Sequence, residues 1–251
     1  MNLNNKNIVL TGASSGIGYE LAKKIAAEKC NLALLSRRIN ILEKLTAELS
    51  VSGSKVIAIK CDVENKDEVA AAFNEVKNTF GSIDIAILNS GVSSLITAEQ
   101  FNSGTAKHIF DVNVIGMIYC IEALLTDFIK NKNGIIIGVS SLADGRGFPR
   151  SGAYCASKAA VSIFLESLRI ELKKHNVKVI TVKPGFVRTA MTAKNNFKMP
   201  FLMNVDKAVS IIMSGIKKEK PIIQFPLPTV LSVKLLKLLP NSLFEMIAGR
   251  V

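Results

Sequence analysis

The chain has 251 residues, a length that fits one large domain or two small ones. Hydrophobic residues make up 49% of it, which is enough for a sizeable core and excludes a disordered or low-complexity chain. The formal net charge of +12 is concentrated near the C-terminus, because residues 173–251 include 14 basic and 3 acidic side chains. The preceding part is nearly neutral, so a general basic coat for nucleic acid is not expected.

The cysteines and the N-terminus indicate a cytoplasmic protein. The four cysteines, Cys30, Cys61, Cys120 and Cys155, lie far apart within apolar or small-residue runs. Their spacing predicts buried free thiols in a reducing compartment, with no metal site. The short polar N-terminus does not have the pattern of a signal peptide, and no run of about 20 apolar residues predicts a spanning helix.

Short apolar runs alternate with segments of helical periodicity along the chain. These runs are rich in Ile and Val and do not alternate with polar residues, which is typical of parallel strands covered on both faces by helices. The expected strands lie at 8–10, 32–35, 56–59, 83–88, 135–137, 179–182 and 221–225. We therefore predict one α/β domain over residues 1–225, followed by a helical tail over 226–251.

A glycine-rich turn follows the first expected strand and opens the first expected helix, in the segment Thr11–Gly18. Backbone N–H groups at a helix N-terminus favour a bound pyrophosphate. Gly12 suits a turn of unusual φ, Gly16 permits close approach of the backbone, and Gly18 permits tight packing of helix on strand. The turn therefore predicts a dinucleotide site.

A second motif, Tyr154-Cys155-Ala156-Ser157-Lys158, lies much further along the chain. The two motifs in this order resemble those of the short-chain dehydrogenase/reductase family, and the resemblance extends over about residues 6–225. It implies a doubly wound, Rossmann-type parallel sheet of about seven strands. It also implies a bound NAD(H) or NADP(H) and hydride transfer between a carbonyl and a secondary alcohol.

The end of the second strand favours NADP(H) as the cofactor. An acidic residue there would accept hydrogen bonds from a ribose and repel a 2′-phosphate, but the chain has Ser36-Arg37-Arg38 instead. Arginine matches phosphate geometry, and the resemblance favours Arg37 for this contact. The expected cofactor-binding residues are Gly12, Ser14, Ser15, Gly16, Ile17, Gly18, Ser36, Arg37, Arg38, Asp62, Val63, Asn89, Gly91, Tyr154, Lys158, Pro184, Gly185, Val187 and Thr189.

The expected catalytic residues are Asn113, Ser141, Tyr154 and Lys158. Tyr154 and Lys158 are four residues apart and share a helix face, where an ammonium group favours the phenolate. Tyr154 is the expected general acid and base. The resemblance assigns Ser141, thirteen residues before Tyr154, to the substrate oxygen, although Ser140 is adjacent. It assigns Asn113 to a water beside Lys158.

The remaining expectations concern substrate and partners. The segment 190–203 resembles a substrate lid, and its Met and Phe residues, with Phe148 and Pro149, suggest a hydrophobic substrate. Apolar positions on two long helices, together with the resemblance, predict a homodimer or homotetramer; these positions are Ile118, Ile121, Leu124, Leu125, Ile163 and Leu165. The apolar, basic tail fits weak peripheral membrane contact, closure of the cavity or packing on a neighbouring subunit. The alternative function is a catalytically idle NADP-binding redox sensor or scaffold.

Overall fold

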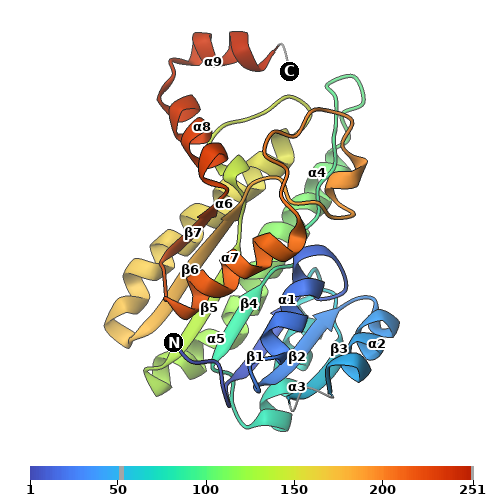
Figure 1. Ribbon diagram of the computed structural model, residues 1–251, viewed down its shortest axis with the longest axis vertical. Helices are drawn as coiled ribbons and strands as arrows, with labels where there is room; N and C mark the ends of the chain where they lie inside the picture. The colour runs from blue at the N-terminus through green and yellow to red at the C-terminus, as the bar shows by residue number, and fades with distance from the viewer. Residues whose placement is uncertain (51–53, 250–251) are drawn as a thin grey trace.

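The computed structural model describes residues 1–50 and 54–249, so the last two residues of the predicted tail lie outside the described residues. Within the described part, seven parallel strands form one sheet in the order β3-β2-β1-β4-β5-β6-β7 (Figure 1). The strands are β1 (Asn7–Thr11), β2 (Asn31–Ser36), β3 (Lys55–Lys60), β4 (Ile85–Leu88), β5 (Gly134–Val139), β6 (Val177–Pro184) and β7 (Ile222–Phe225). The predicted Rossmann-type sheet is confirmed.

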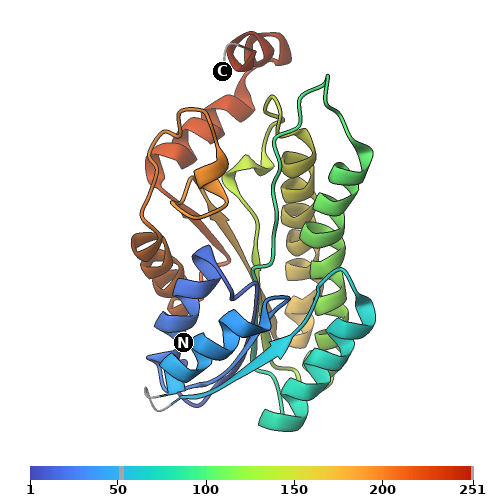
Figure 2. The same cartoon turned by 90° about the vertical axis from the view of Figure 1, so that its right-hand side faces the viewer.

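Helices cover both faces of this sheet (Figure 2). One layer is formed by α1 (Gly16–Ala26), α2 (Ile39–Leu49) and α7 (Val205–Lys217), and the other by α3 (Lys66–Phe80), α5 (Gly116–Asn131) and α6 (Gly152–Glu171). The shorter elements are α4 (Ser103–Phe110), η2 (Asp111–Ile115), η3 (Leu142–Asp144), η4 (Leu172–His175) and η5 (Thr192–Lys194), with α8 (Leu227–Leu238) and α9 (Asn241–Ala248) at the C-terminus.

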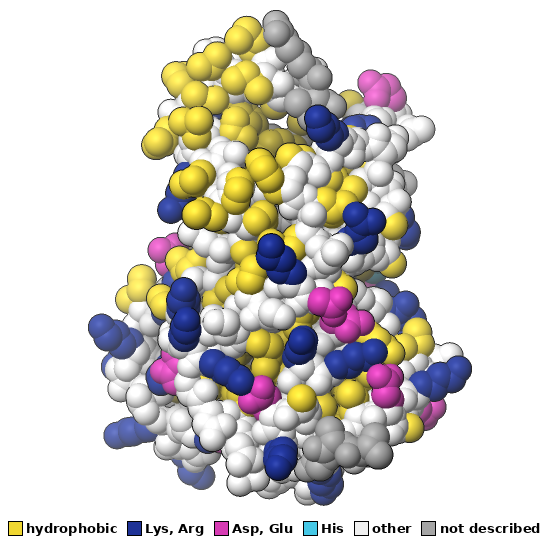
Figure 3. Space-filling view, in the orientation of Figure 1, with side chains coloured by type: hydrophobic (Ala, Val, Ile, Leu, Met, Phe, Trp, Pro, Cys, Tyr) yellow, Lys and Arg dark blue, Asp and Glu magenta, His cyan; other side chains and the backbone are white. Residues whose placement is uncertain are grey.

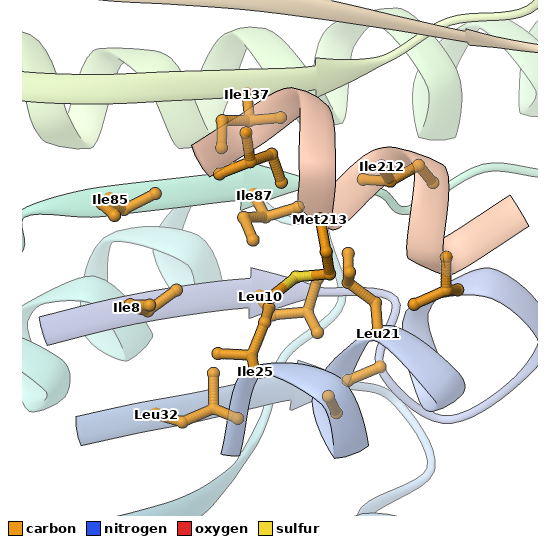
Figure 4. Packing of buried hydrophobic residues seen from close by; sticks show 14 of the residues in the cluster. Ile8, Leu10, Leu21, Ile25, Leu32, Ile85, Ile87, Ile137, Ile212 and Met213 are labelled. Carbon is orange, nitrogen blue, oxygen red and sulfur yellow. The ribbon is translucent and has the colours of Figure 1, made fainter. Parts of the chain in front are cut away.

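Successive residues of the central strand β1 enter different halves of the core. Ile8 and Leu10 pack with α1 and α7, near Leu21 and Met213, whereas Val9 belongs to the cluster on the opposite face (Figure 4). This two-sided burial explains the continuous apolar runs in the sequence. Strand order reverses between β1 and β4, and in open parallel sheets the crevice at such a point binds ligands.

The continuous helical segment 103–131 is long and apolar enough to cross a membrane by length and composition alone. Its inner residues Cys120, Leu124 and Phe128 are buried in the cluster between the sheet and its helices, so it is a core helix of this domain. Three of the positions expected to be available to a partner subunit, Ile121, Leu124 and Leu165, are also buried there. That part of the expectation is wrong, because these side chains face their own sheet.

Candidate active site

A cleft of about 500 Å³ opens at the carboxyl ends of the strands, where the strand order reverses between β1 and β4. Its walls come from the glycine turn, the end of β2, the segments after β3, β4 and β5, the start of α6 and the segment after β6. The cleft therefore gathers the predicted residues from the whole length of the domain. Gly18 and Asn113 are the two predicted site residues that do not line it, because both lie beneath its surface.

The glycine turn has the backbone conformation that the sequence predicts. Gly12 and Gly16 have φ values of +68° and +57°, a region that favours glycine. A Cβ atom at Gly18 would lie 2.3 Å from the carbonyl oxygen of Gly12, so only glycine allows this packing. The turn thus holds open backbone at the N-terminus of α1, which is the geometry an anionic pyrophosphate requires.

The two arginines after β2 have different surroundings. Arg38 donates hydrogen bonds from Nε and a terminal nitrogen to Ser14 Oγ, at 3.1 and 2.8 Å, and one to Ser15 Oγ at 2.8 Å. Arg37 is half exposed and lies 3.7 Å from a carboxylate oxygen of Asp62 and 3.5 Å from one of Glu64. Arg38 is thus fixed to the glycine turn, whereas Arg37 is held loosely beside the cleft.

The side chains of two asparagines form hydrogen bonds that hold together the segments at the base of the cleft. Asn89 Nδ2 donates to the carbonyl oxygens of Thr11 and Gly12, both at 3.2 Å. Asn113 is fully buried in one turn of π-helix, η2; its side chain donates to the Val92 carbonyl and to Ser157 Oγ and accepts from the Val92 N–H. Because its amide is occupied by these protein groups, the Asn113 side chain positions the segment after β4 against α6.

Ser141, Tyr154 and Lys158 all line the cleft and lie close to one another. Burial raises the pKa of the Tyr154 phenol above its ordinary value, and a hydrogen bond with Ser141 opposes that rise. Lys158 Nζ lies 5.8 Å from the centre of the Tyr154 ring and donates to the Val139 carbonyl at 3.0 Å. Burial lowers the pKa of Lys158 to about 8, which makes its proton unusually available near neutral pH.

The neighbouring serine, Ser140, has different partners. Its hydroxyl donates to the Lys158 carbonyl and is 2.8 Å from Ser162 Oγ, which donates to the carboxylate of Asp144. Asp144 also pairs with Lys183 at 2.6 Å. This buried polar network fixes β5, β6 and α6 behind the cleft. No sequence motif marks Asp144 or Lys183, since their pairing depends on elements that meet only in the fold.

The end of β6 and the segment after it form another part of the wall. Pro184, Gly185, Val187 and Thr189, which are predicted to bind the cofactor, line the cleft, and Met191 and Lys194 of the lid join them. Lid residue Phe197 packs edge to face on Phe186. Phe148 and Pro149, expected to line the same cavity, are absent from its described walls; Phe148 packs instead on Phe244 of α9.

The short chain dehydrogenase family model matches residues 6–199 of this chain. An uncharacterised oxidoreductase of Myxococcus xanthus is 35% identical over 98% of this chain and 97% of its own length. A short-chain dehydrogenase/reductase from Burkholderia phymatum, solved with NAD, superposes with a TM-score of 0.86 at 22% identity, covering 94% of both chains. A Sphingobium yanoikuyae short-chain dehydrogenase, solved with NADPH, gives 0.82 at 24% identity over 97% and 95%.

The chain belongs to the short-chain dehydrogenase/reductase family, as its sequence motifs suggest. Proteins of this family are oxidoreductases whose fold binds a nicotinamide dinucleotide and whose substrates are small molecules.

Proposed function

We propose that the protein is an NADP(H)-dependent oxidoreductase that interconverts a carbonyl and a secondary alcohol, with Tyr154 as general acid and base. The observation that carries the proposal is the meeting of Tyr154, Lys158 and Ser141 in one cleft with the glycine turn. The phenol is buried, has a hydroxyl partner and has a cationic neighbour, so it is equipped to exchange a proton with a substrate oxygen.

The residues of the cleft fit a dinucleotide on structural grounds. The glycine turn exposes the N-terminus of α1 to a pyrophosphate, and the hydroxyls of Ser14 and Ser15 lie beside it. Asp62 and Val63 lie at the far wall, where a carboxylate can accept from an adenine amino group and an apolar side chain can pack on the ring. Pro184, Gly185, Val187 and Thr189 would hold the nicotinamide end.

The preference for NADP(H) follows from the charges at the end of β2. Ser36, Arg37 and Arg38 all line the cleft there, where an NAD-specific site would have a carboxylate for the ribose hydroxyls. The loose pairing of Arg37 with Asp62 and Glu64 leaves its guanidinium able to turn to a 2′-phosphate. Arg38, through Ser14 and Ser15, supports the turn itself.

In the reductive direction, a bound NADPH would supply the hydride for the carbonyl carbon. Ser141 donates a hydrogen bond to the substrate oxygen and orients it. The Tyr154 O–H donates its proton to that oxygen, and the substrate leaves as the alcohol. The ammonium group of Lys158 stabilises the resulting phenolate by charge attraction. Asn113 lies beneath Lys158 and fixes the segment after β4 against α6. A water beside that segment would return a proton to Lys158 and Tyr154.

The walls and outer surfaces suggest the substrate and the assembly. Val92, Ala190 and Met191 supply apolar surface at the substrate end, which favours a hydrophobic carbonyl compound. Ile163 and Ile170 are exposed on the outer face of α6 and fit a two-fold contact between subunits, giving a homodimer or homotetramer. The four cysteines are buried and free, which accords with a cytoplasmic location.

The proposal is tested by incubating the purified protein with a panel of aldehydes, ketones and secondary alcohols, each with NADPH or NADP⁺ and with NADH or NAD⁺. We expect turnover of at least one apolar carbonyl compound with the phosphorylated cofactor. Cofactor binding without turnover across the panel would contradict the proposal and support the idle redox sensor or scaffold.

A further inference from the structure

The C-terminal helices are fixed to the body of the protein. They follow β7 and lie beyond the carboxyl ends of the strands (Figure 1). The side chains of Val230 and Phe244 are 3% and 7% exposed, so each helix has a buried side. Lys237 of α8 reaches to 4.0 Å from the buried carboxylate of Asp144. The outer side of these helices therefore has a defined orientation.

One arginine fastens the end of α8. Arg146, in the loop between Ser141 and Tyr154, donates to the carbonyl oxygens of Leu236, Lys237 and Leu239 and to Asn241 Oδ1. Its guanidinium also lies 4.8 Å from the centre of the Phe244 ring. A cation is favourable at the carbonyl end of a helix, where the backbone acceptors are free. The orientation of α8 is thus coupled to the loop beside the active site.

The opposite side of these two helices is a continuous apolar surface, which we call the outer face of α8–α9. In α8 it consists of residues spaced three or four apart, with exposed fractions from 57% to 82%: Leu227, Leu231, Leu235 and Leu238. In α9 it consists of Leu243, Met246 and Ile247, with exposed fractions of 39%, 52% and 42%. Figure 3 shows apolar side chains gathered over this end of the molecule. An apolar patch of this kind marks an interaction site.

The charges around the outer face indicate whether a second copy of the chain or a lipid surface binds there. Lys234 is exposed and lies close to Leu227 and Leu238 around the helix axis, at the border of the leucine face. In the sequence from residue 226 onward, Glu245 is the single acidic residue, and the lid segment 190–203 has Lys194 and Lys198 and no acidic residue. A second copy seated on this face would bring like charges together. An anionic lipid surface accepts the leucines and the lysines at once.

We propose that the outer face of α8–α9 docks the protein on an anionic lipid bilayer. The leucines would enter the boundary between headgroups and acyl chains, with both helices lying in the plane of the surface. The lysine ammonium groups would remain among the lipid phosphates. This inference concerns a surface outside the cleft and does not depend on the redox chemistry.

The chain contains no tryptophan, so the fluorescence of a single introduced tryptophan reports only on the surroundings of that position. The test uses the full-length Leu238→Trp variant, because that position is 82% exposed. The matched control is Ile222→Trp, at a position 43% exposed on β7 and outside the two C-terminal helices. Each protein is mixed with phosphatidylcholine–phosphatidylglycerol vesicles, with and without brominated acyl chains, and with pure phosphatidylcholine vesicles. We expect the Leu238→Trp emission to shift to the blue and to be quenched on the anionic vesicles, while the control does not respond.

Three results would overturn the proposal. They are an unchanged Leu238→Trp emission on anionic vesicles, an equal response of both variants, and an equal response to anionic and neutral vesicles. A blue shift that depends on protein concentration without vesicles would instead assign the face to a second copy. As a further check, Leu231→Gln with Leu235→Gln in the Leu238→Trp background should weaken vesicle binding at least about ten-fold, since it removes two apolar side chains that would enter the bilayer. Undiminished binding would also overturn the proposal.

Discussion

Lys158 Nζ donates a hydrogen bond to the carbonyl oxygen of Val139, so the lysine of the active site is fastened to the end of β5. The side chain is almost fully buried, and within the described residues no carboxylate is paired with it. A buried cation without a counter-charge costs free energy of folding, and the lowered pKa of about 8 expresses that cost.

This relationship predicts that Lys158→Met stabilises the protein at pH 7 while abolishing turnover. Lowering the pKa of Lys158 from 10.5 to about 8 costs the folded protein about 3 kcal/mol, and the substitution removes this cost. The substitution also removes a hydrogen bond worth about 1 kcal/mol, so the free energy of unfolding should rise by an amount on the order of 2 kcal/mol. The measurement is urea unfolding of both proteins without cofactor.

The same gain should depend on pH. Between pH 8 and 10.5 the unfolded chain binds the Lys158 proton and the folded chain does not, so the stability of the unmodified protein rises with pH. The advantage of Lys158→Met should therefore be greatest below pH 8 and shrink toward pH 10.5. An advantage that is constant over this range would show that Lys158 is not buried as a costly cation.

The two arginines after β2 should respond differently to substitution. Arg37→Asp should reverse a preference for NADPH over NADH. The substitution replaces a guanidinium that would bind the 2′-phosphate by a carboxylate that would accept hydrogen bonds from the ribose hydroxyls. We expect NADPH to bind at least ten-fold tighter in the native protein, a difference of about 1.4 kcal/mol. Arg38→Ala should weaken both cofactors alike, since Arg38 holds Ser14 and Ser15. The measurement is titration of the native protein and of each variant with NADPH and with NADH, which gives six dissociation constants. Tighter binding of NADH than of NADPH by the native protein would contradict this interpretation.

Arg146 should keep the tail resistant to proteolysis. Arg146→Met removes four hydrogen bonds to the end of α8 and the start of α9, so limited digestion should cut residues 227–248 faster. Arg150→Met is the matched control, because Arg150 contacts Asn196 and Phe197 of the lid instead. Equal cleavage of the tail in both variants would show that Arg146 does not secure it.

The outer face of α6 should mediate assembly. Ile163 and Ile170 are 68% and 73% exposed, and a charge at each position should oppose burial against a second subunit. Light scattering should show a dimer or tetramer for the native protein at micromolar concentration and a monomer for Ile163→Glu with Ile170→Glu. A monomeric native protein would refute the predicted assembly.

The sequence predicts the strands and the glycine turn well because both depend on local physics. An Ile- and Val-rich run buried on both faces, such as 135–137, has few alternatives to a central parallel strand. The positive φ of Gly12 and the close packing at Gly18 require glycine itself. Four buried free cysteines also match the expectation from their apolar surroundings.

Predictions that depend on which side a residue faces fare less well. In the sequence, Leu124, Leu165 and Ile163 are all apolar residues on long helices, and nothing there separates them. In the structure, Leu124 and Leu165 face the sheet while Ile163 faces outward. Asp144 and Arg146 have no local signal, because their partners come from β6, α6 and the tail. Such contacts arise only from tertiary packing.

The Tyr154→Phe variant tests whether Tyr154 exchanges the proton with the substrate oxygen. The phenyl ring keeps the packing of the cleft and removes only the hydroxyl. With a substrate identified from the panel, kcat should fall by about 10²–10⁴-fold, while NADPH should bind with an unchanged dissociation constant in a fluorescence titration. Retention of native kcat by a variant that still binds NADPH would contradict the mechanism.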